Sequence, residues 1–303
     1  MSRSVKAHLL LVFITFVWGC TFVLVKDALA DCTPMLMNAV RFVLSALLLA
    51  AVFYRELPRI TRGALWAGFQ MGSLLWLGYE FQTTGLKLTS ASKSAFITGL
   101  SVVLVPLLLG LFWRRHINRW TLGGVAVAFV GLYMMTVPPG AFLQAAGSIN
   151  RGDLLTMGCS VSFALQIIVV GRSAQRYPFM QLVVIEVAVA AAWMVLTVPL
   201  AERGAYLHPT HTVLAAIIIC ALLSTVLGFA VQVWAQQFTP PTHTALIFAL
   251  EPVFAALTSY VLLSEVLGWR GGLGAVLILG GVLVSELLGT VQQPEAELRE
   301  EAA

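Results

Sequence analysis

A carboxylate and a proline stand side by side in one of the most apolar stretches of the chain, Glu251-Pro252 within LIFALEPVFAALTSYVLLSE. Proline lacks a backbone N–H and its ring crowds the carbonyl four residues earlier, so Pro252 predicts a helix kink. A carboxylate at the centre of a membrane costs at least about 2.5–3.5 kcal/mol unless it meets a partner or water. Both features fit a helix face that lines a wet interior, where Glu251 could bind an ammonium group or a proton. The alternative is a structural hydrogen bond that fixes this helix to a neighbour.

Three other charged residues lie within apolar stretches: Arg41, Glu80 and Glu186. Arg41 and Glu80 fall at similar depth, and we expect them to form a structural charge pair in preference to contacting a ligand. Loss of either charge would then harm folding, because a stranded buried charge is costly. Glu186 is, with Glu251, a candidate for carrying a coupled proton.

Aromatic and amide side chains recur at positions typical of a cavity wall. Tyr79-Gln82 and Phe229-Gln232 are both i, i+3 pairs, so each pair shares one helix face. A buried glutamine needs hydrogen-bond partners, and an amine or carboxylate of a ligand would supply them. With Glu251, the candidate ligand-binding residues are Trp18, Tyr79, Gln82, Phe163, Gln166, Phe229 and Gln232, and Trp234 has the same character.

The composition places these residues in a membrane protein. Of the 303 residues, 59% are hydrophobic and 11% are charged, whereas a soluble domain carries about 25% charged residues. The net charge of +4 comes without a basic patch interleaved with aromatics, so we expect no nucleic-acid partner. The four cysteines form no ligand-spaced pair, so we expect no metal site. No P-loop, HExxH or GxSxG motif is present, so neither a cofactor nor an enzyme is expected.

Apolar runs of about 20 residues, the length that crosses the hydrocarbon core as a helix, recur along the chain. The first run is expected to stay uncleaved, because it exceeds the apolar core of a secretory signal and no A-x-A site follows. We therefore predict an all-α integral membrane protein with ten transmembrane helices. They lie near residues 7–25, 34–53, 64–83, 93–112, 119–137, 152–171, 179–200, 212–234, 243–262 and 270–288.

The distribution of Lys and Arg predicts the orientation of these spans. With the N-terminus inside, the inner segments hold eleven basic residues and the outer loops hold six. Because basic residues accumulate on the cytoplasmic side, both termini are expected there, in a multi-pass protein of the cytoplasmic (inner) membrane.

The second half of the chain repeats the first. At a shift of 150 residues GYEFQ (78–82) falls on GFAVQ (228–232), and at a shift of 145 Trp18 falls on Phe163. The shift of 150 holds over roughly 60 residues, which is stronger evidence than any single match. We expect one five-helix repeat at 7–137, a second at 152–288 and a polar cytoplasmic tail at 289–303.

An odd number of spans per repeat inverts the second copy relative to the first. Inverted repeats are typical of secondary transporters, whose substrate site lies near the bilayer midplane where the two halves meet. The sequence therefore favours a transporter with a central site.

Several motifs together resemble a known family: FVWGCTF, NAVRF, SAFITGLSVVLVP, ALIFALEPVFAALTSYVLLSE and GGLGAVLILGGVLVSE. They are similar to the drug/metabolite transporter superfamily, specifically its EamA-type ten-span members, over essentially all of residues 7–288. The resemblance implies a secondary transporter that exports a small metabolite, such as an amino acid or a similar amphipathic compound. It also implies a central cavity lined by both repeats.

Two other readings stay open: a channel-like or scramblase-like protein, and a multidrug or organic-cation exporter. A mixed aromatic and amide lining with one acid suits a zwitterion or an organic cation, and Arg41 leaves an anion open. The expected partners are a small-molecule substrate, the lipid bilayer and, as a candidate, protons. The chain is expected to act as a monomer or a homodimer.

Overall fold

Helices in this protein begin where prolines and hydroxyl side chains stand. Pro34 opens one helix at its first turn, where a missing backbone N–H costs nothing. The side chains of Ser2 and Thr210 accept hydrogen bonds from the amides of Val5 and Val213, three residues on, and so cap two further helices. The apolar runs between such signals fold as helices because every backbone group is then paired inside its own segment.

The computed structural model describes residues 2–88, 94, 97–114, 117–136, 151–263 and 268–289. Within these residues the chain is helical, apart from turns, loops and one isolated β-bridge between Cys32 and Leu207. In chain order the elements are α1 (Arg3–Ala28), α2 (Pro34–Val52), the short η1 (Leu57–Arg59), α3 (Arg62–Leu88), α5 (Ser101–Trp113), α6 (Arg119–Thr136), α8 (Arg151–Ala174), α9 (Phe179–Ala201), α10 (His211–Ile219), η2 (Cys220–Leu227), α11 (Gly228–Ala235), α12 (Pro241–Phe248), α13 (Glu251–Leu263) and α14 (Trp269–Gly289).

Several of these helices have the length and the apolar composition of transmembrane helices. Five stretches are long and apolar enough to cross one: α1, α2, α8, α9 and the continuous segment His211–Ala235. The protein is therefore a multi-pass membrane protein. Most of the expected tail and of the loop between the two repeats lies outside the described residues.

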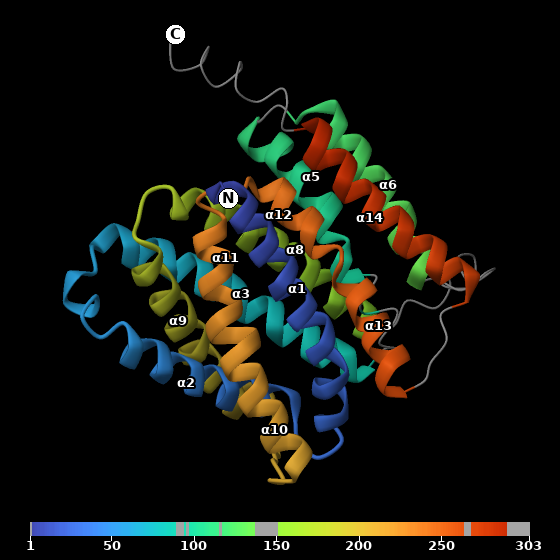
Figure 1. The fold of residues 1–303 in the computed structure, drawn as a ribbon. Coiled ribbons are helices and arrows are strands. Elements are labelled where there is room, and N and C mark those ends of the chain that lie inside the picture. Colours follow the sequence, from blue (N-terminus) through green and yellow to red (C-terminus); the bar gives the residue numbers. More distant parts are fainter. Residues whose placement is uncertain are drawn as a thin grey trace.

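The stretch around Pro252 is interrupted as well as helical. α12 ends at Phe248, residues 249 and 250 form a turn, and α13 begins at Glu251, so Pro252 occupies the first turn of a new helix. Figure 1 shows α12 and α13 following one another past the middle of α1. A Cβ on Gly19 of α1 would lie 2.8 Å from the backbone oxygen of Glu251, so only glycine allows α1 to pass this close. The expected kink is thus a break between two short helices.

The segment between α10 and α11 is a second irregularity. Residues 220–227 form a π-helix, η2, in which the Thr225 hydroxyl donates to the carbonyl of Cys220, five residues earlier, at 3.0 Å. Such wide turns are rare and occur frequently at functional sites. The η2 segment packs against both α1 and α2.

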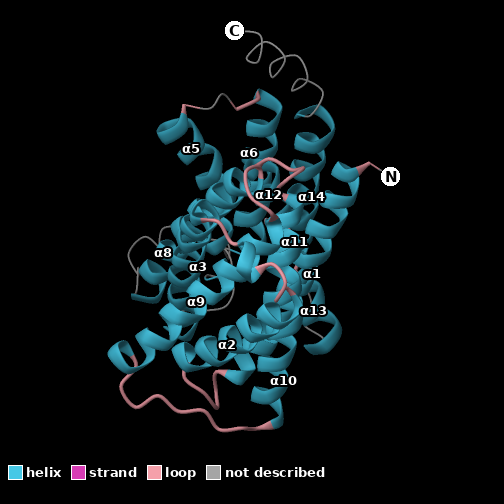
Figure 2. Ribbon diagram, turned by 90° about the vertical axis from the view of Figure 1, so that its left-hand side faces the viewer, coloured by secondary structure: helices cyan, strands magenta, loops and turns pink. Residues whose placement is uncertain are grey.

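At one end of the bundle the loop after α1 is tied to the loop after α9. The amide of Thr33 donates to the Tyr206 carbonyl, and the amide of His208 donates to the Asp31 carbonyl, both at 3.0 Å. Glu202 accepts from the first free amides of α2, those of Met35 and Leu36, at 3.1 and 2.9 Å. Figure 2 shows these loops together at the end of the molecule where α10 begins.

Replacing Glu202 by alanine is expected to destabilise this end of the bundle. The carboxylate satisfies two orphan amides and faces the positive end of the α2 dipole, so its loss should cost about 1–2 kcal/mol. The measurement is thermal unfolding of the purified protein in detergent, with the exposed neighbour Arg203→Ala as control. Equal unfolding temperatures for the two variants would show that the cap contributes nothing.

Candidate functional site

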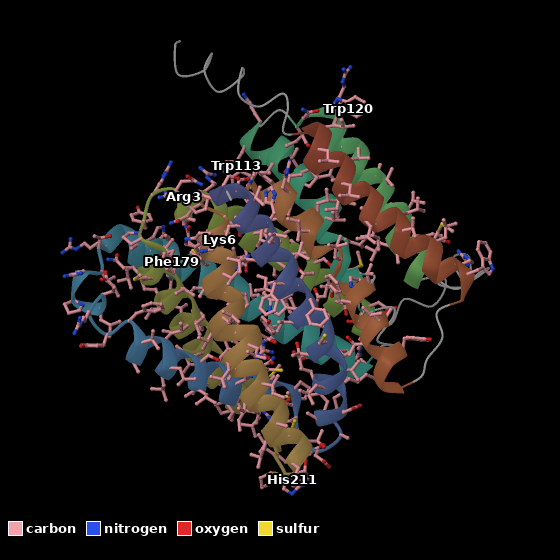
Figure 3. All side chains as sticks on the ribbon, viewed as in Figure 1. Arg3, Lys6, Trp113, Trp120, Phe179 and His211 are labelled. Atoms are coloured by element: carbon pink, nitrogen blue, oxygen red, sulfur yellow. The ribbon has the colours of Figure 1, made fainter. Side chains whose placement is uncertain are left out.

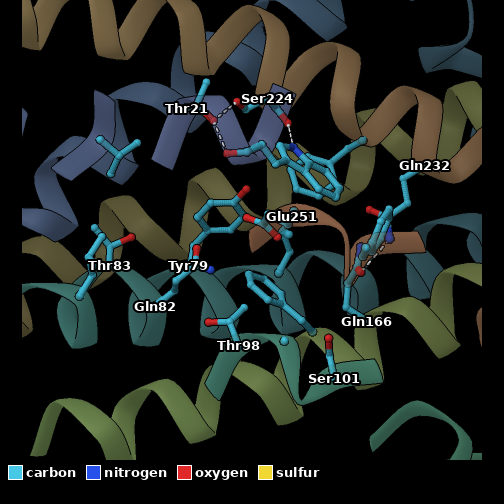
Figure 4. Close-up of a pocket in the computed structure, with 18 of the residues that line it drawn as sticks. Thr21, Tyr79, Gln82, Thr83, Thr98, Ser101, Gln166, Ser224, Gln232 and Glu251 are labelled. Atoms are coloured by element: carbon cyan, nitrogen blue, oxygen red, sulfur yellow. Dashed lines mark hydrogen bonds between the residues drawn. The ribbon is translucent and has the colours of Figure 1, made fainter. Parts of the chain in front are cut away.

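A central cavity is enclosed by six segments of the bundle. Its wall comes from α1, α2, α3, α8, the η2–α11 segment and the α12–α13 break, with further residues at the start of the α5 region. Figure 4 shows aromatic rings, amides and hydroxyls projecting into this space. The cavity volume of about 110 Å³ exceeds the roughly 10–15 Å³ that one water needs, so several waters fit inside. Polar groups on this wall can therefore be hydrated at depth.

The structure brings the ligand-binding candidates of the sequence together. Eight of them lie on the wall of this one cavity: Trp18, Tyr79, Gln82, Phe163, Gln166, Phe229, Gln232 and Glu251. Arg41 and Pro252 lie on the same wall. Three residues predicted with them do not line it: Glu80, Glu186 and Trp234.

Glu251 reaches the cavity because the chain breaks in front of it. It is the first residue of α13, where a negative charge is favoured by the helix dipole. Its side chain is half-buried and accepts no hydrogen bond from any residue that the structure describes. The structural hydrogen bond considered as an alternative is therefore absent among these residues, and the carboxylate is available to a ligand, a proton or water.

The aromatic wall is built by contacts between the two halves of the chain. A Cβ on Gly78 would collide with the Phe163 ring, and a Cβ on Gly228 would lie 2.9 Å from the Trp18 indole. The indole also lies tilted by 42° against the Phe229 ring, with centroids 5.8 Å apart, and donates to the Ser224 carbonyl at 2.9 Å. Glycines therefore let the rings approach the opposing backbones, which fixes the ring positions.

A ladder of buried amides runs from the cavity wall into the protein. Gln232 donates to Gln166 at 3.0 Å and to Gln236 at 3.2 Å, and Gln166 donates to Glu186 Oε1 at 2.7 Å. The ladder ends at the Ile167 carbonyl, which accepts from Gln236 at 2.9 Å. Glu186 is fully buried, and its Oε2 has no hydrogen-bond partner among the described residues. Glu186 thus touches the cavity only through Gln166.

Arg41 does not pair with Glu80, contrary to the sequence prediction. Its Nε donates to Thr225 Oγ1 at 2.8 Å and its Nη2 donates to Tyr79 Oη at 3.3 Å. Both carboxyl oxygens of Glu80 are buried without a hydrogen-bond partner in the described part of the chain. Glu80 and Tyr79 are consecutive on α3 and therefore point about 100° apart around the helix, so only Tyr79 faces Arg41. The expected structural charge pair of Arg41 and Glu80 is therefore not formed.

Cations and rings meet at the end of the bundle where α1 begins. Lys6 Nζ lies 5.5 Å from the Trp234 ring centroid, and the Arg3 guanidinium lies 5.9 Å from that of Phe238. Figure 3 shows Arg3 and Lys6 at this end, far from His211 at the opposite end. Trp234 is therefore a contact between α1 and α11 and does not line the cavity.

The hydroxyl residues of the wall were not predicted from the sequence. They are Thr21, Thr83, Thr98, Ser101 and Ser224. Thr21 hydrogen-bonds the Ser224 hydroxyl at 3.0 Å, and Thr83 accepts from Asn38 at 3.1 Å. Serine and threonine occur throughout transmembrane helices because they can bond the carbonyl one turn earlier. Their presence in an apolar run therefore does not reveal a cavity.

The fold and the cavity together indicate the class of protein. A multi-pass helical membrane protein with a central cavity large enough for water, a broken helix and a carboxylate at the break has the build of a membrane transporter. Among the described residues, no cluster of three metal-ligating side chains occurs.

Comparison with known proteins gives the family. The model of the EamA-like transporter family matches residues 5–137 and again residues 150–287, so the chain belongs to this family and carries two copies of its unit. An "uncharacterized transporter" of Archaeoglobus fulgidus is 32% identical over 94% of this chain and 87% of its own length. A "probable amino-acid metabolite efflux pump" of Salmonella typhimurium is 25% identical over 94% of this chain and 95% of its own. A solved structure described as "Crystal structure of protein", 19% identical, has a TM-score of 0.75 and covers 96% of this chain and all of its own, which shows a shared fold.

Proposed function

We propose that this protein is a secondary transporter that exports a small amphipathic metabolite, an amino acid or a similar compound, across the cytoplasmic membrane. The observation that carries the proposal is the Glu251 carboxylate, which has no hydrogen-bond partner among the described residues and stands at a helix break on the wall of a central cavity with room for water. The names of the Salmonella relative and of an Escherichia coli "probable amino-acid metabolite efflux pump" support the substrate class. Glu251, and Glu186 behind the amide ladder, are the candidate groups for coupling to protons.

Contacts that recur between the halves support ten spans arranged as two inverted repeats. Gly78 meets Phe163, and Gly228 meets Trp18. Gly228 is the repeat equivalent of Gly78, and Phe163 is that of Trp18, so one contact appears twice with its halves exchanged. A pseudo-two-fold relation of this kind is expected where inverted repeats surround a shared site.

Alternating access is supported by the unequal ends of the cavity. Its α1 lining comes from the C-terminal half of that helix, Trp18, Thr21 and Val25. The first half of α1 contributes no residue to this lining and instead contacts α11 through Lys6 and Trp234, while the amide ladder joins α8 to α11. A transporter that opens one end at a time must break such contacts, whereas a channel or scramblase would need a continuous path.

The orientation of the spans is a separate prediction. With both termini in the cytoplasm, a reporter fused after residue 147 should lie outside and one fused at the C-terminus should lie inside, because the basic residues favour this direction. A phosphatase and a fluorescent reporter, active on opposite sides of the membrane, measure the two positions. The same side at both positions would contradict the topology.

The test of the function is an export screen in cells that do or do not produce the chain. Efflux of a metabolite panel is measured, with a fluorescent lipid-flip assay and an ion-leak assay in parallel on vesicles containing the purified protein. Saturable efflux of one compound class without lipid flip or leak is the expected result. Lipid flip or unsaturable leak would favour the channel-like or scramblase-like reading, and efflux of organic cations alone would favour a multidrug exporter.

A further inference from the structure

Arg41 is a buried cation with no anionic partner in the described part of the chain. Its side chain is 4% exposed, and its guanidinium contacts no carboxylate among the residues that the structure describes. Two rings cover it instead, with the guanidinium carbon 4.9 Å from the Tyr79 centroid and 5.4 Å from the Phe42 centroid. Cation–π contacts of this kind offset part of the cost of burial but use no N–H group.

The Arg41 guanidinium has N–H donors that no described residue accepts from. It carries five N–H donors, and the structure uses one on Thr225 and one on Tyr79. Three donors therefore have no acceptor among the described residues, while the side chain lines the cavity. A planar guanidinium with free donors matches a carboxylate, which it binds through two parallel hydrogen bonds.

The π-helical segment holds this group in position. Thr225 donates its only hydroxyl proton to the Cys220 carbonyl, so the Thr225 oxygen must accept from Arg41 Nε. Ser45, one turn beyond Arg41 on α2, shares its hydroxyl proton between the Arg41 carbonyl at 2.8 Å and the Ala221 carbonyl of the same segment at 3.2 Å. The wide turn of η2 thus places an acceptor against Nε and leaves the end of the guanidinium to the cavity.

The Glu251 carboxylate lines the same cavity as the Arg41 guanidinium and has the opposite charge when ionised. The Tyr79 hydroxyl accepts a hydrogen bond from Arg41, and Tyr79 and Glu251 line the same cavity. Figure 4 shows Tyr79 and Glu251 projecting into the same space. The Tyr79 hydroxyl keeps its own proton free for a ligand, because it only accepts from Arg41.

We propose that Arg41, assisted by the Tyr79 hydroxyl, binds the carboxylate of a zwitterionic substrate whose ammonium group faces Glu251. This assignment rests on the proposed export function and makes Arg41 the residue that selects amino acids over amines. An amine lacking the carboxylate would fill the aromatic part of the cavity and leave the guanidinium unpaired. A site whose buried polar group is left unpaired discriminates strongly against the ligand that lacks the partner.

The test compares two ligands that differ only in the carboxylate. Binding of radiolabelled L-phenylalanine and of phenethylamine to the purified full chain in detergent is measured for the unmodified protein, Arg41→Gln and Arg41→Lys. We expect the unmodified protein to prefer phenylalanine at least about tenfold, equivalent to about 1.4 kcal/mol. Arg41→Gln should weaken phenylalanine binding by a similar factor and change phenethylamine binding less than about threefold. Arg41→Lys, which keeps the charge but loses the planar fork, should fall between them.

Control variants separate binding from folding. Arg176→Gln removes the same charge from an exposed position and should bind both ligands as the unmodified protein does. If Arg41→Gln does not fold, Tyr79→Phe tests the same unit: it keeps the ring, and it should weaken phenylalanine binding alone. The proposal is overturned if a folded Arg41→Gln binds phenylalanine normally, if acid and amine lose affinity equally, or if Tyr79→Phe does not affect the acid.

The outcomes also separate this proposal from the function. Saturable efflux of amines without binding of phenylalanine would support the proposed transport function and contradict the proposed role of Arg41. If the export screen shows no saturable efflux of any metabolite, both the proposed export function and the proposed role of Arg41 are contradicted.

Discussion

Glu251→Gln is expected to produce a folded protein whose export rate falls at least about tenfold, the size of a lost charge-assisted hydrogen bond. Glutamine keeps the size of the side chain and its place at the start of α13, and no described residue hydrogen-bonds the carboxylate it replaces. Folding should therefore be nearly unaffected. Binding of a substrate ammonium or a proton needs the carboxylate itself, so the loss should appear in transport.

The measurement is the export rate against pH for both proteins, normalised to folded protein in the membrane. If Glu251 carries a proton, the dependence of the rate on pH should disappear with the substitution, while Arg41 and Tyr79, which share the cavity, are unchanged. Asp27→Asn, at the exposed end of α1, removes a carboxylate away from the cavity and serves as control. Equal rates and equal pH profiles for Glu251→Gln and the unmodified protein would leave Glu251 with no role in transport.

The sequence predicted the wall of the cavity better than the contacts within it. Glu251-Pro252 pointed to a helix break, because proline and a carboxylate both need an irregular, wet environment in a membrane. The repeat aligned Tyr79-Gln82 with Phe229-Gln232, and both pairs line the cavity. Such positions are readable because polar groups are rare in apolar runs.

The partner of Arg41 could not be read in the same way. Depth along a helix follows from counting residues, but rotation about the helix axis does not, since lipid-facing and core-facing sides are both apolar here. Arg41 and Glu80 match in depth, yet Arg41 faces Thr225 on a segment 184 residues away. The π-helix that presents Thr225 has no signal in CALLSTVL, which contains neither proline nor glycine. Tertiary contacts alone define that part of the site.

Glycines set the packing of α6 on α14. A Cβ on Gly124 would lie 2.5 Å from the Gly281 carbonyl oxygen, and one on Gly131 would lie 2.5 Å from that of Gly274. The earlier glycine of α6 meets the later glycine of α14, so the helices are antiparallel, as Figure 1 shows them side by side. Small residues permit this approach of two backbones, which is what holds helices together in a membrane.

Gly124→Ala is therefore expected to destabilise the protein, and Gly123→Ala is expected not to. The added methyl group at 124 would collide with a backbone atom, which cannot rotate away, and overpacking of this kind costs about 1–3 kcal/mol. A Cβ at Gly123 meets nothing within 4 Å, so the neighbouring substitution makes the same chemical change on the same helix without the collision. Thermal unfolding in detergent should show a lower midpoint for Gly124→Ala only. Equal midpoints for the two variants would show that α6 and α14 do not need to approach at glycine distance, and that their pairing is not a source of stability.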